Sequence, residues 1–483
     1  MRRVLLPLLS ALTLILIGMV VDQFPFANGP AEWEWTYRPL GLEPGAAVLA
    51  AIAAALIAWA VSRPRPKRSP PRTLAGLILL GLIFTFNLVA AQPEGLERVL
   101  RSLASRNSFG YVFDAGLAPP TRELLTDYPR ATAGLNQHSR THPPGPLLLV
   151  RGLDAVGDGL RPLLAGAGGL WDRAAEALER EAQRARDRRR PAPKEGEMPS
   201  PGALLLLALL LPGLSVLTAA PLHRLALDWG LPPRSGFLAA GLWLLVPARS
   251  LFTPSLDQAL PFLLVAAAVL ATPSRRGTWR PIAAGVLAAL CTVVTYGYVV
   301  MLPLLAGLAA FESGEPGRIR LNLGRPVLLG VGFTLPWLAL VLGGGFDFWP
   351  AFQIALAEHK QIAVVTRDYQ TWLLWNPYDF ALLLGPAVLG LAAAAAVPVR
   401  VPARTPVFRT GVWLWWGILL LLLFLGSVRG EVGRIWLMFM PFACLFAAEI
   451  VAGHEDGRKA GGWLALLQGA LAMALAAAMV FVS

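Results

Sequence analysis

Thirteen apolar runs divide the chain, and each is separated from the next by a more polar stretch. A run of roughly 15 to 22 apolar residues can form a helix that crosses the ~30 Å hydrocarbon core of a bilayer. The pattern therefore predicts an all-α polytopic membrane protein with about thirteen transmembrane helices. The predicted spans are 4–21, 46–62, 73–91, 202–222, 236–250, 258–272, 281–296, 298–311, 326–344, 379–397, 410–426, 433–452 and 461–482.

Two features of this pattern leave alternatives open. The runs that meet at Tyr296, Gly297 and Tyr298 could form one broken helix, and the orientation of every later span depends on that choice. The opening MRRVLLPLLSALTLILIGMVVD has the charged start and apolar body of a signal peptide. Its apolar run is long enough to span a bilayer, and no clear small-x-small cleavage site follows. We therefore expect an uncleaved first span with a cytoplasmic N-terminus.

The composition supports a membrane protein. The 483 residues are 55% hydrophobic and 15% charged, and the mean hydropathy is +0.57, values unlike those of a water-soluble domain. The formal net charge of +12 does not indicate nucleic-acid binding, because the basic residues form short clusters between apolar runs. Cys291 and Cys444 both lie inside apolar runs, so we expect neither a disulfide framework nor a metal cluster.

Loop charges predict which side of the membrane each loop occupies. Four basic loops, 63–72, 274–280, 317–325 and 399–409, all fall in the cytoplasm if the N-terminus is cytoplasmic and thirteen helices span, as the positive-inside rule requires. The segments left outside are 22–45, 92–201, 251–257, 345–378 and 427–432. The basic, probable helix at 171–194 also falls outside. Loops beyond ~60 residues largely escape the charge rule, so we keep this segment outside, on the membrane surface or as a solvated insert.

The scarce ionisable residues gather in the external loops, most densely at HSRTHPPGP, residues 138–146. The two adjacent prolines fix their backbone torsions and keep His142 out of helical geometry, and a proline is tolerated in the first turn of the helix that follows. This pattern predicts a rigid corner in front of an apolar helix. The residues alone fit a ligand-binding corner and a purely structural turn equally well.

Other external segments carry further candidates. The loop 92–146 also contains FGYVFDAG and TRELLTDYP, with Asp114 and Asp127, and SLFTPSLDQ places Asp257 at the end of a span. Later loops gather more cations, carboxylates and interfacial aromatic residues on the same predicted face: His359, Lys360, Arg367, Trp372, Trp375, Tyr378, Asp379, Arg429, Glu431 and Arg434.

The order of these elements resembles the conserved module of the GT-C superfamily of membrane glycosyltransferases, which includes the protein O-mannosyltransferases and the aminoarabinose transferases. The shared features are a span, a long acidic external loop that closes on an (H/K)PP(L/G) element, an external helix, and a short loop with an aspartate. The resemblance covers roughly residues 73–311 and divides the chain into three regions. These are an N-terminal hairpin with its basic loop (1–72), a catalytic module with external loop 92–201 (73–311), and a C-terminal region with external loop 345–378 (312–483). The hairpin 4–62 and the segment 160–200 have no counterpart in the family pattern.

The resemblance implies a GT-C type helical bundle in a bacterial inner membrane with an extracytoplasmic active site. It implies transfer of a sugar from a polyprenyl phosphate to a hydroxyl of a glycan, lipid or protein acceptor. In the family an acidic residue of the first large external loop acts as base, so Asp114 is the first candidate and Asp127 the second. The remaining implied site residues, which would hold donor phosphate or substrate, are His138, Arg140, His142, Asp257, Lys360, Arg367, Tyr378, Glu431 and Arg434, with Arg434 the preferred clamp. Some members use a divalent cation, but no ligand spacing here selects one.

Two other function classes remain as alternatives. A secondary transporter or lipid flippase would usually show repeated halves, broken helices and ionisable residues near the bilayer midplane. The apolar runs consist almost entirely of Leu, Ala, Val and Gly, and no repeat is visible. A non-catalytic scaffold for envelope assembly would not need the concentrated Asp, His and Arg residues of 109–146.

Overall fold

The computed structural model describes residues 2–24, 36–63, 71–164, 169–194, 197–273, 277–313, 319–397, 405–453 and 456–480. This part of the chain is about 80% helical, as the apolar runs predict. Most of the predicted cytoplasmic loops 63–72 and 399–409, and parts of 274–280 and 317–325, lie outside the described residues.

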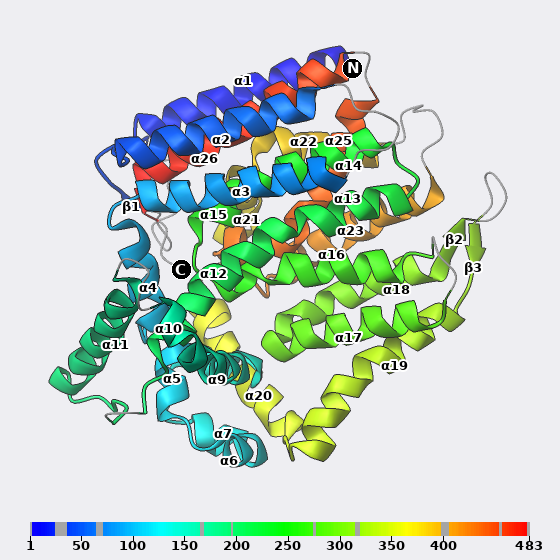
Figure 1. The fold of residues 1–483 in the computed structure, drawn as a ribbon. Helices are drawn as coiled ribbons and strands as arrows, with labels where there is room; N and C mark the ends of the chain where they lie inside the picture. Colours follow the sequence, from blue (N-terminus) through cyan, green and yellow to red (C-terminus); the bar gives the residue numbers. More distant parts are fainter. Residues whose placement is uncertain are drawn as a thin grey trace.

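The first half of the chain forms an N-terminal helical group and then a series of shorter helices (Figure 1). The elements up to the external segment are α1 (Arg2–Val21), β1 (Thr36–Tyr37), α2 (Pro44–Ser62), α3 (Pro71–Ala91), α4 (Gly95–Ala104), α5 (Tyr111–Leu117), α6 (Thr121–Thr126), α7 (Tyr128–Thr132), α8 (Gln137–Thr141), α9 (Gly145–Gly157), η2 (Asp158–Leu160), α10 (Arg161–Leu164) and α11 (Leu170–Asp187).

The second half contains most of the bundle. Its first elements are α12 (Pro201–Leu217), α13 (Ala219–Asp228), α14 (Pro233–Leu244), α15 (Pro247–Leu251), η3 (Leu256–Gln258), α16 (Leu260–Ala271), α17 (Trp279–Val294), η4 (Tyr296–Met301), α18 (Leu302–Ala310), β2 (Phe311–Ser313) and β3 (Ile319–Leu321). The last are α19 (Gly324–Leu338), η5 (Ala339–Gly343), α20 (Phe348–His359), η6 (Lys360–Val365), α21 (Tyr369–Leu384), α22 (Pro386–Ala396), α23 (Pro406–Leu425), α24 (Val432–Ile435), η7 (Leu437–Phe439), α25 (Met440–Ala452), α26 (Gly457–Ala478) and β4 (Met479–Val480).

Each of the thirteen predicted spans coincides with one helix or with consecutive helices. Fewer than thirteen of these helical segments, however, are long enough to cross a bilayer. Among the described residues, six helical segments are long and apolar enough to cross a bilayer: Pro44–Ser62, Arg72–Ala91, Pro201–Asp228, Gly324–Gly343, Pro406–Leu425 and Gly457–Ala478. A seventh is added if α21 and α22, which meet at a bend of 109°, form one span. Helix length therefore supports a membrane protein but does not confirm a count of thirteen.

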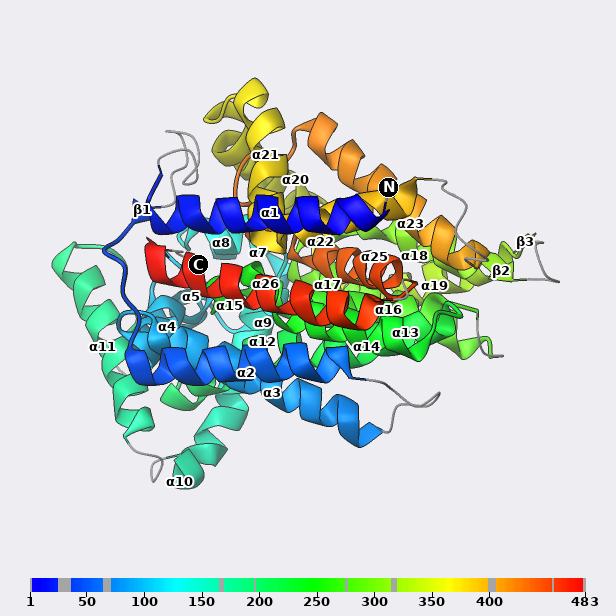
Figure 2. The same ribbon diagram turned by 90° about the horizontal axis from the view of Figure 1, so that it is seen from above.

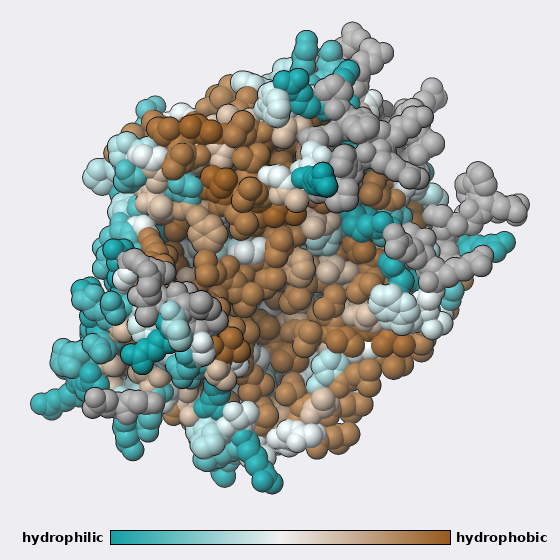
Figure 3. Space-filling model, in the orientation of Figure 1, coloured by the Kyte–Doolittle hydropathy of each residue, from teal (hydrophilic) through white to brown (hydrophobic). Residues whose placement is uncertain are grey.

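The molecule has an apolar middle and two polar ends. A broad band of apolar side chains covers the face seen in Figure 3, with hydrophilic side chains gathered at either end of it. The N-terminus of α1 lies at one end with the β2–β3 hairpin, whereas β1, α4 and α11 lie at the opposite end (Figures 1 and 2). Antiparallel pairing of β1 with β4 brings the end of α26 to the same side as α4 and α11.

The helices of residues 92–201, the segment predicted to be external, form a packed layer rather than a loose loop. Helix α11 contacts α4 and α12. It buries a stripe of small apolar side chains at Ala174, Ala177, Leu178, Ala182 and Ala185. The basic segment 171–194, predicted as a helix on the membrane surface or as a solvated insert, forms a helix held against its neighbours by an apolar face.

The centre of the bundle is built from α14 and α25, whose residues are almost all buried. The closest crossing in the bundle joins α17 to α19. A Cβ atom added to Gly285 would lie 2.0 Å from the Leu329 carbonyl oxygen, and one added to Gly332 would lie 2.0 Å from that of Ile282. Such small-residue crossings are typical of helix pairs in membranes. This pair fixes the position of η4 and, through α19, that of α20.

Candidate functional site

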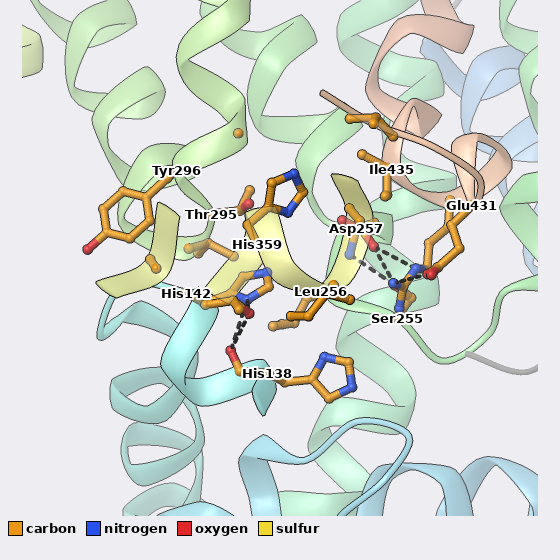
Figure 4. A pocket seen from close by; sticks show the side chains of 18 of the residues that line it. His138, His142, Ser255, Leu256, Asp257, Thr295, Tyr296, His359, Glu431 and Ile435 are labelled. Carbon is orange, nitrogen blue, oxygen red and sulfur yellow. Dashed lines mark hydrogen bonds and ion pairs between the residues drawn. The ribbon is translucent and has the colours of Figure 1, made fainter. Parts of the chain in front are cut away.

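A cavity of about 640 Å³ lies where η3, η4, α20 and the segment before α25 meet the short helix α8 (Figure 4). Six residues that sequence analysis named as site residues line it: His138, His142, Asp257, Arg367, Glu431 and Arg434. The fold therefore brings together segments that are far apart in the sequence. The cavity combines these ionisable groups with apolar walls.

The HPPG corner holds His142 at the edge of this cavity. Helix α8 ends at Thr141, His142 is extended, and α9 begins at Gly145, as the two prolines predict. The hydroxyl of Tyr128 donates to the carbonyl oxygens of Ser139 and His142, both at 3.0 Å. A Cβ atom on Gly145 would lie 2.2 Å from the carbonyl oxygen of Val293, so a glycine is needed for α9 to reach the end of α17.

The hydrogen bonds of His142 define its chemistry. Its Nδ1 lies 2.9 Å from the His138 carbonyl oxygen, which can only accept, so Nδ1 carries the proton and Nε2 is left as an acceptor. Removal of water from around the half-buried ring lowers the pKa of His142 to about 3, and the neighbouring His138 also lowers it. The imidazole is therefore neutral near pH 7 and cannot serve as a fixed cation for phosphate.

Two arginines and two carboxylates form a charge network at the polar end of the cavity. Arg434 lies between Glu431, whose Oε2 is 2.6 Å from its Nη2, and Asp257, whose Oδ2 is 3.5 Å from its Nε. Arg367 donates to the other oxygen of Glu431 at 3.2 Å. Both oxygens of Glu431 are thus engaged. Burial raises the pKa of the Glu431 carboxyl, but the charges of Arg434 and Arg367 outweigh this effect and lower it overall.

Asp257 differs from Glu431 in how its oxygens are used. The Ser255 hydroxyl donates to Oδ2 at 3.0 Å, and Arg434 approaches the same atom. Neither contact uses Oδ1. Ser255 also caps η3 by accepting from the backbone N–H of Asp257, so the short helix holds this carboxylate in place. Asp257 is thus the carboxylate of the network with an oxygen left for a ligand in the cavity.

The structure does not place Asp114, the first candidate for the base, in the cavity. Its side chain is fully buried in α5, and Oδ2 accepts from the Asn136 backbone N–H at 2.8 Å and from the Ser139 hydroxyl at 2.6 Å. Burial raises the pKa of the Asp114 carboxyl, and these hydrogen bonds oppose the rise. Through these hydrogen bonds Asp114 holds α8, the helix that carries His138, in place. Because its carboxyl is buried outside the cavity, the hydroxyl of an acceptor substrate there cannot reach it.

Four further expected site residues also lie outside the cavity lining. Asp127 is half exposed and pairs with Arg130 at 3.2 Å. Arg140 pairs with Glu358 at 3.2 Å and so ties α8 to α20. Lys360 is exposed on η6, and Tyr378 packs edge-on against Trp375 in α21. These side chains brace or border the site, and none of them reaches the space inside it.

Several lining residues were not singled out as site residues by the sequence. His359 points toward the cavity from the end of α20, and its Nε2 lies 2.8 Å from the Ser427 carbonyl oxygen. Thr295 and Tyr296 enter from η4 (Figure 4). The sequence already shows His359 as a histidine of a predicted external loop, whereas Thr295 and Tyr296 end the predicted span 281–296 and have no charged residue beside them.

Much of the remaining wall is apolar and reaches the outer surface of the bundle. Leu260, Val294, Val300, Ile362 and Met438 line the cavity. Val299 and Leu356 also line it, and they are 51% and 57% exposed. The cavity thus has a polar end inside and an apolar opening. Within the described residues no group of three His, Cys, Asp or Glu side chains is arranged to hold a metal ion.

Comparisons with known protein families, with curated proteins and with solved structures gave no match to this chain. The chemistry of the cavity therefore provides the basis for assigning a function.

Proposed function

We propose that this protein is a glycosyltransferase of GT-C type, which transfers a sugar from a polyprenyl phosphate donor to an acceptor hydroxyl at the extracytoplasmic face of the membrane. The proposed site is the cavity that contains Asp257 and Arg434. Asp257 replaces Asp114 as the proposed base, because a base must lie within hydrogen-bonding reach of the proton that it takes.

The observation that carries this proposal is the division of one cavity into a charged end and an apolar opening. A lipid-linked sugar has a charged phosphate beside a long hydrocarbon chain, so it needs both surfaces next to each other. Val299 and Leu356 would lie against the chain at the opening, and Arg434 and Arg367 would lie near the phosphate. Arginine suits this role because its planar guanidinium matches phosphate geometry.

The proposed reaction is a displacement at the anomeric carbon. Asp257 accepts the proton of the acceptor hydroxyl on Oδ1 as the acceptor oxygen bonds to the anomeric carbon. The bond between that carbon and the phosphate oxygen breaks, and polyprenyl phosphate leaves with its electron pair. Arg434 stabilises the charge that develops on the leaving phosphate. The Nε2 of His142, a neutral acceptor, orients a hydroxyl of the sugar or the acceptor.

We also propose thirteen spans with the N-terminus in the cytoplasm of a bacterial inner membrane, with the shorter helices counted as spans. Pairing of β1 with β4 supports this topology, because it requires the first external segment and the end of α26 to share one side. If the N-terminus is cytoplasmic, the segment after the first span is external. The segment after the thirteenth span is then external as well, because thirteen is odd. The cavity then lies on the external side, where η3, η4 and the 427–432 segment meet.

Binding of the donor lipid tests this proposal. Arg434→Gln should weaken binding of a polyprenyl phosphate to the full chain by about tenfold to hundredfold, because it removes a charge-assisted contact. Arg434→Lys, which keeps the charge, should recover part of the affinity. The measurement is microscale thermophoresis in neutral-lipid nanodiscs.

Arg140→Gln is the matched control, since Arg140 carries the same charge outside the cavity lining. It should leave the affinity within about threefold of the original, the range expected for a partly exposed ion pair. Equal losses in Arg140→Gln and Arg434→Gln would show that positive charge in general attracts the lipid and would argue against a specific phosphate site.

A further inference from the structure

A second, smaller pocket lies on the external layer, between the end of α4 and the C-terminal end of α11. It has a volume of about 150 Å³ and is lined by Ser105, Arg106, Asn107, Glu181, Arg184, Ala185, Arg188 and Arg190. At about 30 Å³ per water molecule this is room for roughly five waters, enough for a phosphate group. The lining contains four arginines and a single carboxylate.

The local structure of α11 explains why the arginines converge here. The helix ends with Arg189 at a positive φ of 52°, and the backbone N–H of Arg190 donates to the carbonyl oxygen of Ala185. This is a reversing turn of the kind that ends many helices, normally with glycine at the left-handed position. It folds the chain back so that Arg188 and Arg190 border the same pocket as Arg184.

The single carboxylate of the pocket is already engaged. Oε1 of Glu181 accepts from the Arg106 backbone N–H at 3.0 Å, and Oε2 pairs with Arg184 at 3.5 Å. The Glu181 side chain is only 13% exposed. It fixes the floor of the pocket and leaves three positive charges in excess. Within the described part of the chain, Arg188 and Arg190 have no side-chain ion pair.

The polar lining points to a water-soluble anion rather than a lipid tail. Ala185 is the one apolar residue among the eight, and the surface over α11 is hydrophilic (lower left in Figure 3). A lipid would need an apolar wall for its chains, as the large cavity has. Arginine clusters recognise phosphate through charge and through paired N–H donors.

The pocket and the large cavity share one segment of chain. Ser105, Arg106 and Asn107 line the pocket, and the next residues, Ser108 and Phe109, line the cavity. The segment is fixed on both sides: Glu181 holds the Arg106 N–H, and the Asn136 side chain donates to the Arg106 carbonyl oxygen at 2.6 Å. A ligand held in the pocket therefore lies beside the chain segment whose next residues line the large cavity.

We propose that this arginine pocket binds a phosphate group of the acceptor substrate, so that a phosphate-bearing acceptor extends over the 105–109 segment into the large cavity. The identification of this ligand as the acceptor rests on the proposed glycosyl transfer. The binding of phosphate in the pocket does not, and it can be measured without turnover.

The test is binding of inorganic pyrophosphate to the full chain in nanodiscs of neutral lipid, followed by isothermal titration calorimetry. Arg188→Gln with Arg190→Gln should weaken saturable binding by about tenfold, because two charged donors are lost. Both side chains are exposed, so folding is retained. The control is Arg173→Gln with Arg186→Gln, which removes the same charge from exposed positions of α11 outside the pocket and should change affinity by less than about twofold.

Equal weakening in the two double variants, or no saturable binding, would overturn the proposal, since general attraction to a basic helix would then explain the result. Nanodiscs that contain phosphatidylglycerol separate the two sources of phosphate. Unchanged pyrophosphate affinity in these discs supports a soluble ligand. Loss of pyrophosphate binding there would assign the pocket to a lipid headgroup and overturn the proposal. If the original chain binds pyrophosphate but transfers no sugar, the proposed glycosyl transfer is refuted and the proposed phosphate site stands.

Discussion

At the scale of single residues, His142 shows how backbone geometry fixes protonation. The prolines that follow it, the Tyr128 hydroxyl on its carbonyl group and the His138 carbonyl oxygen at Nδ1 all restrict the ring. Its neutral form presents Nε2 as an acceptor. From the sequence alone, a histidine in a cation-rich loop suggests a positively charged ligand for phosphate. In the fold, desolvation and nearby positive charges lower the pKa of His142 and favour the neutral imidazole.

The lowered pKa of His142 predicts a pH dependence of stability. The folded state has a pKa of about 3, whereas an exposed histidine titrates near 6.5. Between these values the unfolded chain binds more protons, so the contribution of His142 to stability is complete above about pH 6.5 and is lost as the pH falls toward 3. His142→Gln should therefore lose less thermal stability than the original chain between pH 6.5 and pH 4. The check is the melting temperature in detergent across this range, and parallel pH profiles would contradict the assigned protonation state.

The change of the proposed base from Asp114 to Asp257 shows what local sequence can and cannot reveal. The aromatic and small neighbours of Asp114 predict a packed, dry environment, and the structure has one. That same packing closes the carboxylate off from the cavity. Asp257 meets Arg434 only through the folding of distant segments, and no local pattern in SLDQ or RGEVGRIW encodes that contact.

At the scale of elements, the contact between α9 and α17 depends on one glycine. Gly145→Ala would place a Cβ atom 2.2 Å from the Val293 carbonyl oxygen, so α9 must shift. We expect a loss of about 1–3 kcal/mol in stability, the usual cost of overpacking, with displacement of His142 from the cavity edge. Gly152→Ala is the control on the same helix, because nothing lies within 4 Å of its added Cβ. It should be neutral or slightly stabilising, since alanine favours helix more than glycine does.

Thermal unfolding in detergent compares the two variants. If Gly145→Ala and Gly152→Ala melt at the same temperature, the close approach of α9 to α17 is not required, and the conformational role assigned to the glycine of HPPG is wrong.

The positions of the helices could be predicted from the sequence better than their lengths and bends could. Each apolar run is a helix because an apolar segment in a membrane must satisfy its backbone hydrogen bonds internally. The runs do not reveal where a helix breaks. Gly385, at a φ of 103°, separates α21 from α22 at a bend of 109°, and η4 separates α17 from α18. These breaks arise from packing between helices, and they explain why six or seven described segments reach full span length.

At the scale of the whole molecule, the fold separates an apolar band from two polar ends (Figures 1 and 3), and both pockets border the 105–109 segment. The large cavity has the surfaces that a lipid-linked donor requires, and the arginine pocket faces water. A transporter would need a polar route along the bundle to the opposite end. The ionisable residues that line the cavity instead come from short elements and turns: α8, η3, the end of α20, the segment between η6 and α21, and the 427–434 segment.

The central claim is that Asp257 activates an acceptor hydroxyl for sugar transfer. The most direct measurement is turnover by the full chain in liposomes with a panel of polyprenyl phosphate sugars and hydroxyl-bearing acceptors. The original chain should form product, and Asp257→Asn should be slower by at least about hundredfold, as expected when a general base is removed. Asp114→Asn, which changes a carboxylate outside the cavity, should stay within about tenfold. Transfer by Asp257→Asn at the original rate, or no transfer from any donor in the panel, would contradict the central claim.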